Sequence, residues 1–305
     1  MSSVISARMR SRVLVRPSTT ALCATGHDVH VVTRSGTTVA GALPVVADAC
    51  DGARLTEICA GSVAIYNCVN PPYDTWPQSW PPIARALLSA AAASVAVLAT
   101  AGNLYPYGPL NGPMTQGMPD LGTGTKAVVR AVMTREAMDA HRAGRLRAVE
   151  VRGSDYLGGN SYLDAVVTPA YRKGRTAWVP ADLDLPHTFT NVRDMAATLV
   201  AAAADEGSWG TVWHAPSAPP ITLRELTRLA ASRLGVAPKV RSMPYAAVWM
   251  GGVFNPFVKE LRETQCQFRR PYVMDSTRAQ EYFAIAPITI EESVRTDLEH
   301  SASRL

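Results

Sequence analysis

Tyrosine, asparagine and tryptophan residues recur just after several apolar runs of the sequence. Their side chains suit proton transfer and ligand binding. They are Asn70, Tyr73, Trp76 and Trp80 after residues 62–69, Asn103, Tyr105 and Tyr107 after residues 94–100, and Tyr156, Asn160 and Tyr162 after residues 146–152. A phenol can transfer a proton when its surroundings bring its pKa toward neutrality. Aromatic walls with a few polar groups are typical of a ligand pocket. We therefore predict a small-molecule pocket built from these segments.

The apolar runs predict the strands that must hold these side chains. β-Branched and apolar residues recur over 29–33, 43–47, 62–69, 94–100 and 146–151, and helical patterns cover 82–93 and 126–143. Strands separated by helices at this spacing indicate βαβ units and a parallel sheet. The ligand crevice of such a sheet lies outside the carboxyl ends of its strands. The residues expected to line it together are Asn70, Tyr73, Asn103, Tyr105, Tyr107, Lys126 and Tyr156.

The second half of the chain is more irregular, with helices expected over residues 191–204 and 223–234. Thr222 and Glu225 form a capping box for the second helix, and Gly235 is placed to end it. We assign residues 1–155 to a Rossmann-like core and residues 156–305 to a substrate lobe interleaved with the end of that core in one compact unit. The expected fold class is α/β, a Rossmann-type doubly wound parallel sheet with a smaller C-terminal lobe.

Composition and charge narrow the class of protein. The chain has 305 residues, 47% of them hydrophobic, and a net charge of +5 from basic residues that are scattered except near the N-terminus. A short terminal basic run is more often a solvated end than a nucleic-acid site. Five cysteines without a C-x-x-C pair favour a reduced protein without disulfides or zinc. No membrane span or secretory signal is legible, so we expect a cytoplasmic protein that binds neither nucleic acid nor membrane.

Several segments stand in an order that resembles a known family. Arg152–Gly158 (RGSDYLG) is similar to a strand-end segment near the substrate, Phe189–Ala196 (FTNVRDMA) to a helix start of the form F-x-x-V-x-D-x-A, and Phe283–Ser293 to a closing F-G-x-x-P-T-x-x-E-E segment. Over residues 26–292 the chain thus resembles the NAD-dependent epimerase/dehydratase family, the extended or atypical short-chain dehydrogenases. The resemblance implies a nicotinamide cofactor and a small-molecule substrate.

The residue after the first well-formed β run bears on the choice of cofactor. Rossmann proteins contact the adenosine ribose there; an acidic residue favours NAD, whereas an arginine accommodates the 2′-phosphate of NADP. Arg34 holds this position, and Asp48 and Asn70, which follow the next two runs, are assigned to the same cofactor site. The expected cofactor is NADP, with weak or absent binding because of the altered loop described next.

The family's G-x-G-x-x-G turn, which lets the backbone approach the pyrophosphate at a helix N-terminus, has no intact counterpart here. If Val4 and Ile5 form the first strand, Ser6, Arg8 and Ser11 replace the three glycines and become cofactor-binding candidates.

A second alignment takes Val13–Val15 as the first strand. Residues 16–25 are then too few for both a loop and a full helix, so the loop would be deleted, and Pro17 would interrupt a helix beyond its first turn. No glycine precedes Gly26 in either alignment, and the sequence leaves both open.

The family's catalytic pattern is a Ser or Thr followed by Tyr-x-x-x-Lys, in which the tyrosine moves a proton and the lysine lowers its pKa. By this resemblance Lys126 is the family lysine, Gly122 stands where the tyrosine belongs, and Asn103 falls at the Ser/Thr position. Tyr105 and Tyr107 are the nearest phenols, so the catalytic candidates are Tyr105, Lys126, Asn103 and Tyr107. The substrate candidates are Tyr73, Trp76, Tyr156 and Asn160.

Three functions follow from these features. The resemblance favours an NADP-dependent, epimerase/dehydratase-like oxidoreductase acting on a small, fairly apolar carbonyl or alcohol. The altered glycine turn and the missing tyrosine favour either a cofactor-independent enzyme, such as a cyclase or dehydratase of a biosynthetic pathway, or a non-catalytic ligand-binding relative. No metal-binding spacing is legible, and the sequence leaves a homodimer open.

Overall fold

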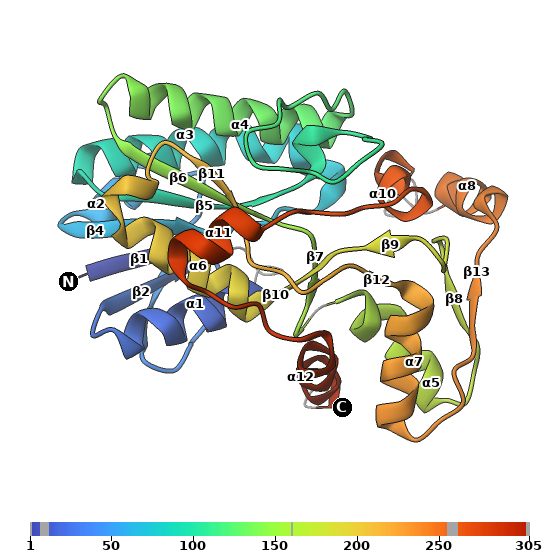
Figure 1. Ribbon diagram of the computed structural model, residues 1–305. Coiled ribbons are helices and arrows are strands. Elements are labelled where there is room, and N and C mark those ends of the chain that lie inside the picture. Colours follow the sequence, from blue (N-terminus) through green and yellow to red (C-terminus); the bar gives the residue numbers. More distant parts are fainter. Residues whose placement is uncertain (1, 7–11, 160, 255–261, 303–305) are drawn as a thin grey trace.

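A computed structural model describes residues 2–6, 12–159, 161–254 and 262–302 (Figure 1). Within these ranges, seven strands form one parallel sheet in the order β11-β6-β5-β4-β1-β2-β3. They are β1 (Ser2–Ser6), β2 (Asp28–Thr33), β3 (Ala42–Val46), β4 (Ser62–Asn67), β5 (Val97–Asn103), β6 (Arg147–Gly153) and β11 (Val212–His214).

Each face of the sheet has its own core because successive strand residues point to opposite sides. Ile5, Tyr66 and Ala99 belong to one buried cluster, whereas their neighbours Ile65 and Leu98 belong to the other. Strands that are buried on both faces read as near-continuous apolar runs, which is why the sequence marks them so clearly.

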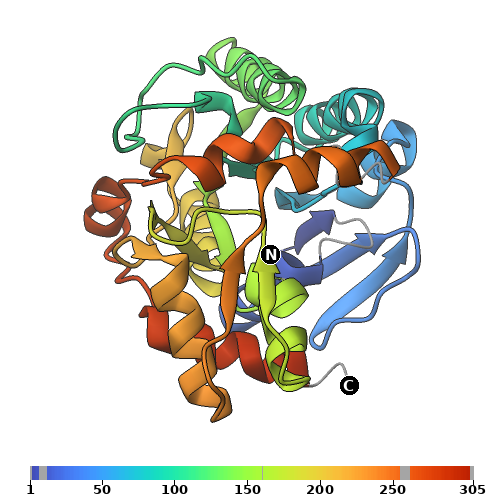
Figure 2. The same ribbon diagram turned by 90° about the vertical axis from the view of Figure 1, so that its right-hand side faces the viewer.

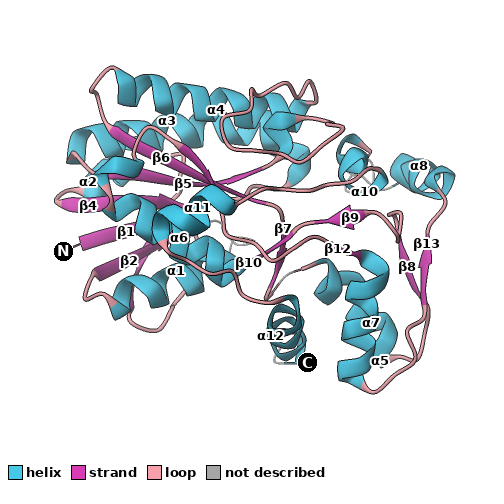
Figure 3. Ribbon diagram, in the orientation of Figure 1, coloured by secondary structure: helices cyan, strands magenta, loops and turns pink. Residues whose placement is uncertain are grey.

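Helices cover both faces (Figure 3). The face of Ile5 packs against α1 (Arg12–Ala24), α6 (Val192–Ala204) and α11 (Thr277–Phe283), and the opposite face packs against α2 (Gly52–Cys59), α3 (Trp76–Ser94) and α4 (Thr125–Arg142). Among the described helices, none is both long enough and apolar enough to cross a membrane.

Most of the remaining elements form a lobe at the carboxyl edge of the sheet (Figure 1 and Figure 2). Its helices are η3 (Leu163–Val167), α5 (Thr168–Arg172), α7 (Leu223–Leu234), α8 (Tyr245–Phe254), α10 (Cys266–Arg269) and α12 (Ile290–Ala302). Its short strand pairs are β7 (Asp155–Leu157) with β10 (Phe189–Asn191), β9 (Pro186–His187) with β12 (Ile221–Thr222), and β8 (Ala177–Val179) with β13 (Val240–Ser242). Leu163, Leu226 and Val294 meet in the core of the lobe, so three distant segments of the chain build it.

The predicted doubly wound α/β fold is confirmed, and the five predicted strands are β2 to β6. The predicted capping box is present: the Thr222 hydroxyl accepts a hydrogen bond from the Glu225 N–H, and the Glu225 carboxylate accepts one from the Thr222 N–H. Gly235 ends α7 in the left-handed conformation, with φ of 68°, which glycine adopts without strain.

The structure decides between the two alignments of the N-terminus. Val4 and Ile5 lie in β1, paired with β2 and β4, whereas Val13–Val15 lie in α1. The alignment that deletes the loop is therefore wrong, and Ser6 ends the first strand of the sheet.

Two expectations about proline are corrected. Pro17 lies inside α1 and does not end it; its missing N–H leaves the Val13 carbonyl without a helical partner. The helix predicted over residues 82–93 begins at Trp76, so Pro81 and Pro82 lie inside α3 rather than at its start.

Candidate functional site

Three segments that follow neighbouring strands meet at the carboxyl edge of the sheet. The short helix η1 (Tyr73–Thr75) follows β4, η2 (Tyr105–Tyr107) follows β5, and Lys126 lies in the first turn of α4. The hydroxyls of Tyr73 and Tyr105 are hydrogen-bonded at 2.8 Å, and Lys126 Nζ lies 5.5 Å from the centroid of the Tyr73 ring. We call these three residues, with Asp155 and Tyr156 described below, the strand-end cluster.

Both phenols of this pair are protonated at neutral pH. Burial raises the pKa of Tyr105 well above its ordinary value. Burial also raises the pKa of Tyr73, and the lowering effects of its bond to Tyr105 and of the charges of Arg130 and Lys126 do not offset this. Each hydroxyl is therefore a proton donor. The sequence predicted that Lys126 lowers the pKa of a phenol, but at Tyr73 this effect is weaker than that of burial.

Lys126 is only 1% exposed, so it is not a solvent-facing residue at the start of a helix. Its Nζ lies 3.0 Å from Glu263 Oε2, and its backbone N–H donates to Glu263 Oε1 at 2.6 Å. Glu263 opens η5 (Glu263–Gln265) in the lobe. Its carboxylate thus caps the N-terminus of α4, where negative charge is favourable, and fixes the lysine at the same time. No local pattern around Glu263 marks this role in the sequence.

Gly122 cannot be restored to the family's tyrosine without moving the backbone. A Cβ at Gly122 would come within 2.6 Å of the Ala127 side chain and 2.7 Å of the Tyr105 carbonyl oxygen. The Gly122 N–H also donates to the Pro106 carbonyl at 2.8 Å, which seats this loop directly on η2. The chain at Gly122 is therefore packed against the segment that carries Tyr105.

Arg130 lies one turn after Lys126 on the same side of α4. Its guanidinium carbon lies 5.1 Å from the centroid of the Trp76 ring and 4.3 Å from that of Trp80, and Nη1 donates to the Ala101 carbonyl at 3.2 Å. Trp76 is 1% exposed, and its indole N–H donates to the Pro71 carbonyl. The structure thus places Trp76 in the core under the cluster, not on a surface that a substrate could touch.

The sequence predicted two asparagines, Asn103 and Asn70, just after strands. Asn103 Oδ1 accepts a hydrogen bond of 3.2 Å from the Tyr105 N–H, so its side chain holds the start of η2. Asn70 is partly exposed in the loop between β4 and η1. Asn160, the other amide assigned to the substrate, lies outside the described residues.

Tyr156 and Asp155 join the cluster from β7, which continues from β6 into the lobe (Figure 1). Both are partly exposed. Burial raises the pKa of Tyr156, and the positive charge of Arg130 lowers it by less. The negative charges of Asp155 and of ionised Tyr73 raise it further. Asp155 accepts a hydrogen bond of 2.8 Å from His187 Nε2. No motif in the sequence predicts a role for Asp155, although it stands just after the buried strand β6.

Tyr107 is directed into a different environment from Tyr105. It is 2% exposed, and its hydroxyl lies 2.7 Å from His214 Nε2. His214 Nδ1 donates to the Asp275 carbonyl at 2.7 Å, and burial lowers the His214 pKa to about 4, so the imidazole is neutral and Nε2 accepts from Tyr107. The hydroxyl is therefore occupied, and we remove Tyr107 from the candidate catalytic groups.

Arg152 connects Tyr107 to two carboxylates. Its guanidinium carbon lies 4.6 Å from the centroid of the Tyr107 ring, Nε donates to Glu150 at 2.8 Å, and the two terminal nitrogens donate to Asp120 at 2.7 and 3.0 Å. Glu150 also accepts from the Thr134 hydroxyl at 2.5 Å. We call Tyr107, His214, Arg152 and Glu150 the buried network, and Asp120 binds Arg152 from its partly exposed edge.

The residues predicted to bind the adenosine half of a cofactor lie at the ends of β1 to β4. Arg34 and Asp48 are both about half exposed, with Nη1 and Oδ2 4.0 Å apart. At this distance the pair is loose, so the Arg34 guanidinium remains accessible to a phosphate. Ser6 ends β1. Arg8 and Ser11 lie outside the described residues, as does the turn they belong to.

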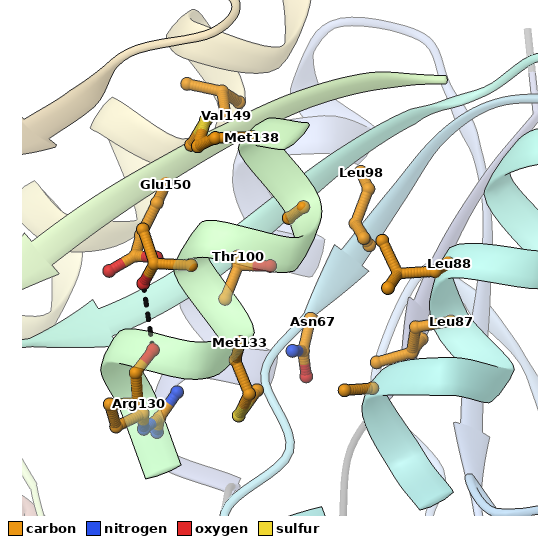
Figure 4. Close-up of a pocket in the computed structure, with 13 residues that line it drawn as sticks. Asn67, Leu87, Leu88, Leu98, Thr100, Arg130, Met133, Met138, Val149 and Glu150 are labelled. Atoms are coloured by element: carbon orange, nitrogen blue, oxygen red, sulfur yellow. Dashed lines mark hydrogen bonds between the residues drawn. The ribbon is translucent and has the colours of Figure 1, made fainter. Parts of the chain in front are cut away.

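A small cavity lies between α3, α4 and the sheet (Figure 4). Leu87, Leu98 and Met133 supply apolar walls, and Arg130 and Glu150 supply charge. Its volume of about 20 Å³ holds about one water molecule. The cavity is a void beside the buried network and is too small for a substrate.

No protein-family model matches the sequence, and no curated protein matches it. The fold, however, matches solved structures over nearly the whole chain. MoeE5 in complex with UDP-glucose and NAD has a TM-score of 0.78 at 15% identity, covering 98% of this chain and 99% of its own. UDP-glucuronic acid 4-epimerase from Bacillus cereus in complex with NAD has a TM-score of 0.78 at 11% identity, covering 99% of both chains.

A third structure gives the same result. The dTDP-glucose 4,6-dehydratase from Bacillus anthracis in complex with NAD has a TM-score of 0.78 at 12% identity, covering 99% of this chain and 97% of its own. Two of these three structures are thus a sugar-nucleotide epimerase and a sugar-nucleotide dehydratase by name, and the fold that the sequence resemblance implied is confirmed. Identities this low establish the fold alone.

Proposed function

We propose that this chain is a nicotinamide-dinucleotide-dependent oxidoreductase of the epimerase or dehydratase type, with the strand-end cluster as its catalytic site. The observation that carries the proposal is the hydrogen-bonded Tyr73–Tyr105 pair beside Lys126 at the carboxyl edge of a parallel sheet. Ligands of open α/β sheets bind at that edge. Neighbours with the same fold were solved in complex with NAD.

The residues at the ends of β2, β3 and β4 would suit the adenosine half of such a cofactor. Arg34 would hold a 2′-phosphate, which favours NADP, and Asp48 and Asn70 would line the adenosine half. When bound, the dinucleotide exchanges a hydride with a substrate carbon. Because Ser6, Arg8 and Ser11 replace the glycines of the phosphate turn, we propose that binding is weak.

The phenol pair would take over the role of the tyrosine that Gly122 replaces. Tyr105 would donate a proton to a substrate carbonyl oxygen, and Tyr73 would replenish it through the 2.8 Å hydrogen bond between the two hydroxyls. Lys126, held by Glu263, would keep a positive charge beside the Tyr73 ring. Asn103 would act by positioning the Tyr105 backbone.

The substrate we propose is a sugar nucleotide rather than a small apolar molecule. One neighbour was solved with UDP-glucose, and another structure of the same protein was solved with UDP-glucuronic acid. The partly exposed groups of the strand-end cluster are hydroxyls and a carboxylate, which suit a substrate rich in hydroxyl groups. An apolar substrate would offer these groups no hydrogen bond beyond those they already make within the protein.

The test is a titration of the purified protein with NADPH and NADH, followed by fluorescence. We expect NADPH to bind more tightly than NADH, and Arg34→Ala to remove that difference. Arg54→Ala, which alters an exposed arginine paired with Glu57 on α2, is the matched control and should leave both affinities unchanged. The proposal is contradicted if the wild-type protein binds neither dinucleotide.

A cofactor-independent enzyme is the second candidate. The ion pair between Lys126 and Glu263 favours it, because a lysine already held by a carboxylate is less available to a cofactor ribose. In that case catalytic turnover would persist in protein stripped of dinucleotide and would still depend on Tyr105.

A further inference from the structure

Asp155 presents a carboxylate at the point where the sheet passes into the lobe. β6 ends at Gly153, and Asp155 begins β7, which is fixed by its pairing with β10 at Phe189. The side chain of Asp155 is 29% exposed, whereas that of His187, its hydrogen-bond partner at 2.8 Å, is 4% exposed. The carboxylate is thus the accessible member of the pair, and the imidazole lies behind it.

The imidazole of His187 is held by aromatic rings. Its centroid lies 4.6 Å from that of Phe189, 5.2 Å from that of Tyr272 and 5.7 Å from that of Phe268, which is stacked on it at an interplanar angle of 10°. A ring enclosed in this way has little freedom to turn, so the direction of its N–H toward Asp155 is fixed. His187 therefore orients one carboxylate oxygen and leaves the other for a further contact.

Asp155 acts electrostatically on the phenols of the strand-end cluster. Its negative charge raises the pKa values of Tyr73, Tyr105 and Tyr156, after the larger effect of burial. It has the same effect on Tyr162 and Tyr272. Because all five phenols keep their protons at neutral pH, none of them can serve as a base there. The accessible anion among these donors is the carboxylate.

We propose that Asp155 is a general base that removes a proton from the carbon next to a substrate carbonyl, and that His187 is its positioning residue. The C–H bond breaks, and its proton goes to the Asp155 carboxylate. The electron pair forms a C=C bond, and the carbonyl π pair moves to oxygen, which takes the hydroxyl proton of Tyr105. Return of a proton from a water molecule to the opposite face of the carbon inverts it, and Asp155 passes its own proton to the hydroxide that the water leaves. In a dehydration, the hydroxyl group on the next carbon leaves with the proton held by Asp155 as water, and the enol returns its proton to Tyr105 as a C=C bond conjugated to the carbonyl forms.

This step goes beyond the proposed hydride chemistry, because it needs no dinucleotide. The substrate class is an α-hydroxy ketone, of which a keto sugar is one example. Tyr105 has the same role as proton donor in both reactions, so the two share a site. A carboxylate base and a phenol donor are the two groups that general acid–base catalysis of this step requires.

The experiment measures exchange of substrate carbon-bound hydrogen with D₂O by NMR, in protein freed of dinucleotide. The probes are the 4-keto form of UDP-glucose and dihydroxyacetone. We expect the wild-type protein to exchange at least one of them, and Asp155→Asn to lower the rate by about a hundredfold or more, the scale typical of a lost acid–base group. Asp28→Asn, which changes an exposed carboxylate at the amino end of β2, is the matched control and should exchange at the wild-type rate.

Two further readouts separate chemistry from folding. Asp155→Asn should leave NADPH affinity and thermal stability close to wild type, and it should let the tyrosines ionise at lower pH in an ultraviolet titration because a negative charge has been removed. His187→Gln, which keeps an N–H donor, should retain more of kcat than His187→Leu, with KM unchanged in both.

If the wild-type protein shows no exchange, or if wild type and Asp155→Asn exchange at the same rate, Asp155 is not the general base. Exchange that persists in a protein that binds no dinucleotide would support Asp155 while contradicting the proposed hydride chemistry. Failure of the dinucleotide titration and failure of this inference are therefore distinguishable.

Discussion

Tyr105 and Tyr107 stand two residues apart in η2 and belong to different regions of the molecule. The Tyr105 hydroxyl meets that of Tyr73 in the strand-end cluster, whereas the Tyr107 hydroxyl is bound to His214 in the buried network. A 3₁₀ helix has about three residues per turn, so side chains two residues apart point about 120° away from each other. Proximity in sequence therefore does not predict a shared site.

The two regions contain similar groups and differ in what those groups can still bind. Arg152 and Lys126 are both buried cations held by carboxylates, yet Arg152 binds two of them and also covers a tyrosine ring. In the strand-end cluster, Tyr73, Tyr105 and Asp155 remain partly exposed. Saturated, buried polar groups stabilise a fold, whereas oriented, accessible ones can act on a ligand. We therefore assign structure to the buried network and chemistry to the strand-end cluster.

Removal of the central cation of the buried network should have the largest effect on stability. Arg152→Met leaves Glu150 buried without its charged partner, and breaking a buried ion pair in this way costs about 3–5 kcal/mol of the free energy of unfolding. Urea denaturation measures the loss. Arg224→Met, which removes an exposed bridge to Asp184, should cost about 1 kcal/mol or less. An equal loss in both variants would contradict the structural role of the network.

Acid should weaken the same network through His214. Burial lowers its pKa to about 4, from an ordinary value of 6.5. Between these values the unfolded chain binds a proton that the folded chain does not, so stability falls as the pH falls through this range, by up to about 3 kcal/mol. The free energy of unfolding, measured by urea at neutral pH and at about pH 4.5, should fall less in His214→Gln than in the wild type.

The comparison with His214→Gln is needed because Asp194 acts in the opposite direction. Burial raises the Asp194 pKa to about 6, so this carboxyl contributes stability in acid that is lost as the pH rises. Only the difference between wild type and variant isolates the imidazole. Identical pH dependence in the two proteins would show that His214 is not the acid-sensitive group.

A smaller effect is expected at the cofactor contact that we propose for the strand-end cluster. If Lys126 donates a hydrogen bond to the cofactor, Lys126→Ala should weaken NADPH binding and lower turnover, since a hydrogen bond to a charged group contributes about 1.5–3 kcal/mol. Lys173→Ala, at an exposed site after α5, is the control. Fluorescence titration gives the affinities. Unchanged affinity in Lys126→Ala would place the cofactor elsewhere or favour the cofactor-independent enzyme.

The sequence predicts the fold because its signals are local. Apolar runs mark strands that are buried on both faces, and Thr222, Glu225 and Gly235 mark the two ends of α7 within a few residues of each other. It also predicts that Tyr73, Tyr105 and Lys126 come together, since each follows a strand or opens the next helix of a parallel sheet.

The rest of the site depends on contacts that no local pattern records. Glu263 contacts Lys126, which is 137 residues away in the sequence, and His187 contacts Asp155, which is 32 residues away. Both Glu263 and His187 belong to the lobe. Burial also decides roles that residue type alone leaves open: Trp76 resembles a ligand contact in sequence and is a core residue in the structure. The turn that contains Arg8 and Ser11 lies outside the described residues, so its predicted effect on the cofactor stays a prediction.

The most direct test of the division between the two regions compares Tyr105→Phe with Tyr107→Phe in turnover and in thermal stability. The account predicts that Tyr105→Phe lowers kcat by about a hundredfold or more with Tm nearly unchanged, because it removes the proton donor. Tyr107→Phe should keep kcat and lose about 1–3 kcal/mol of stability, because it leaves His214 Nε2 buried without a donor. The reverse assignment of the two losses, or full activity in both variants, would contradict it.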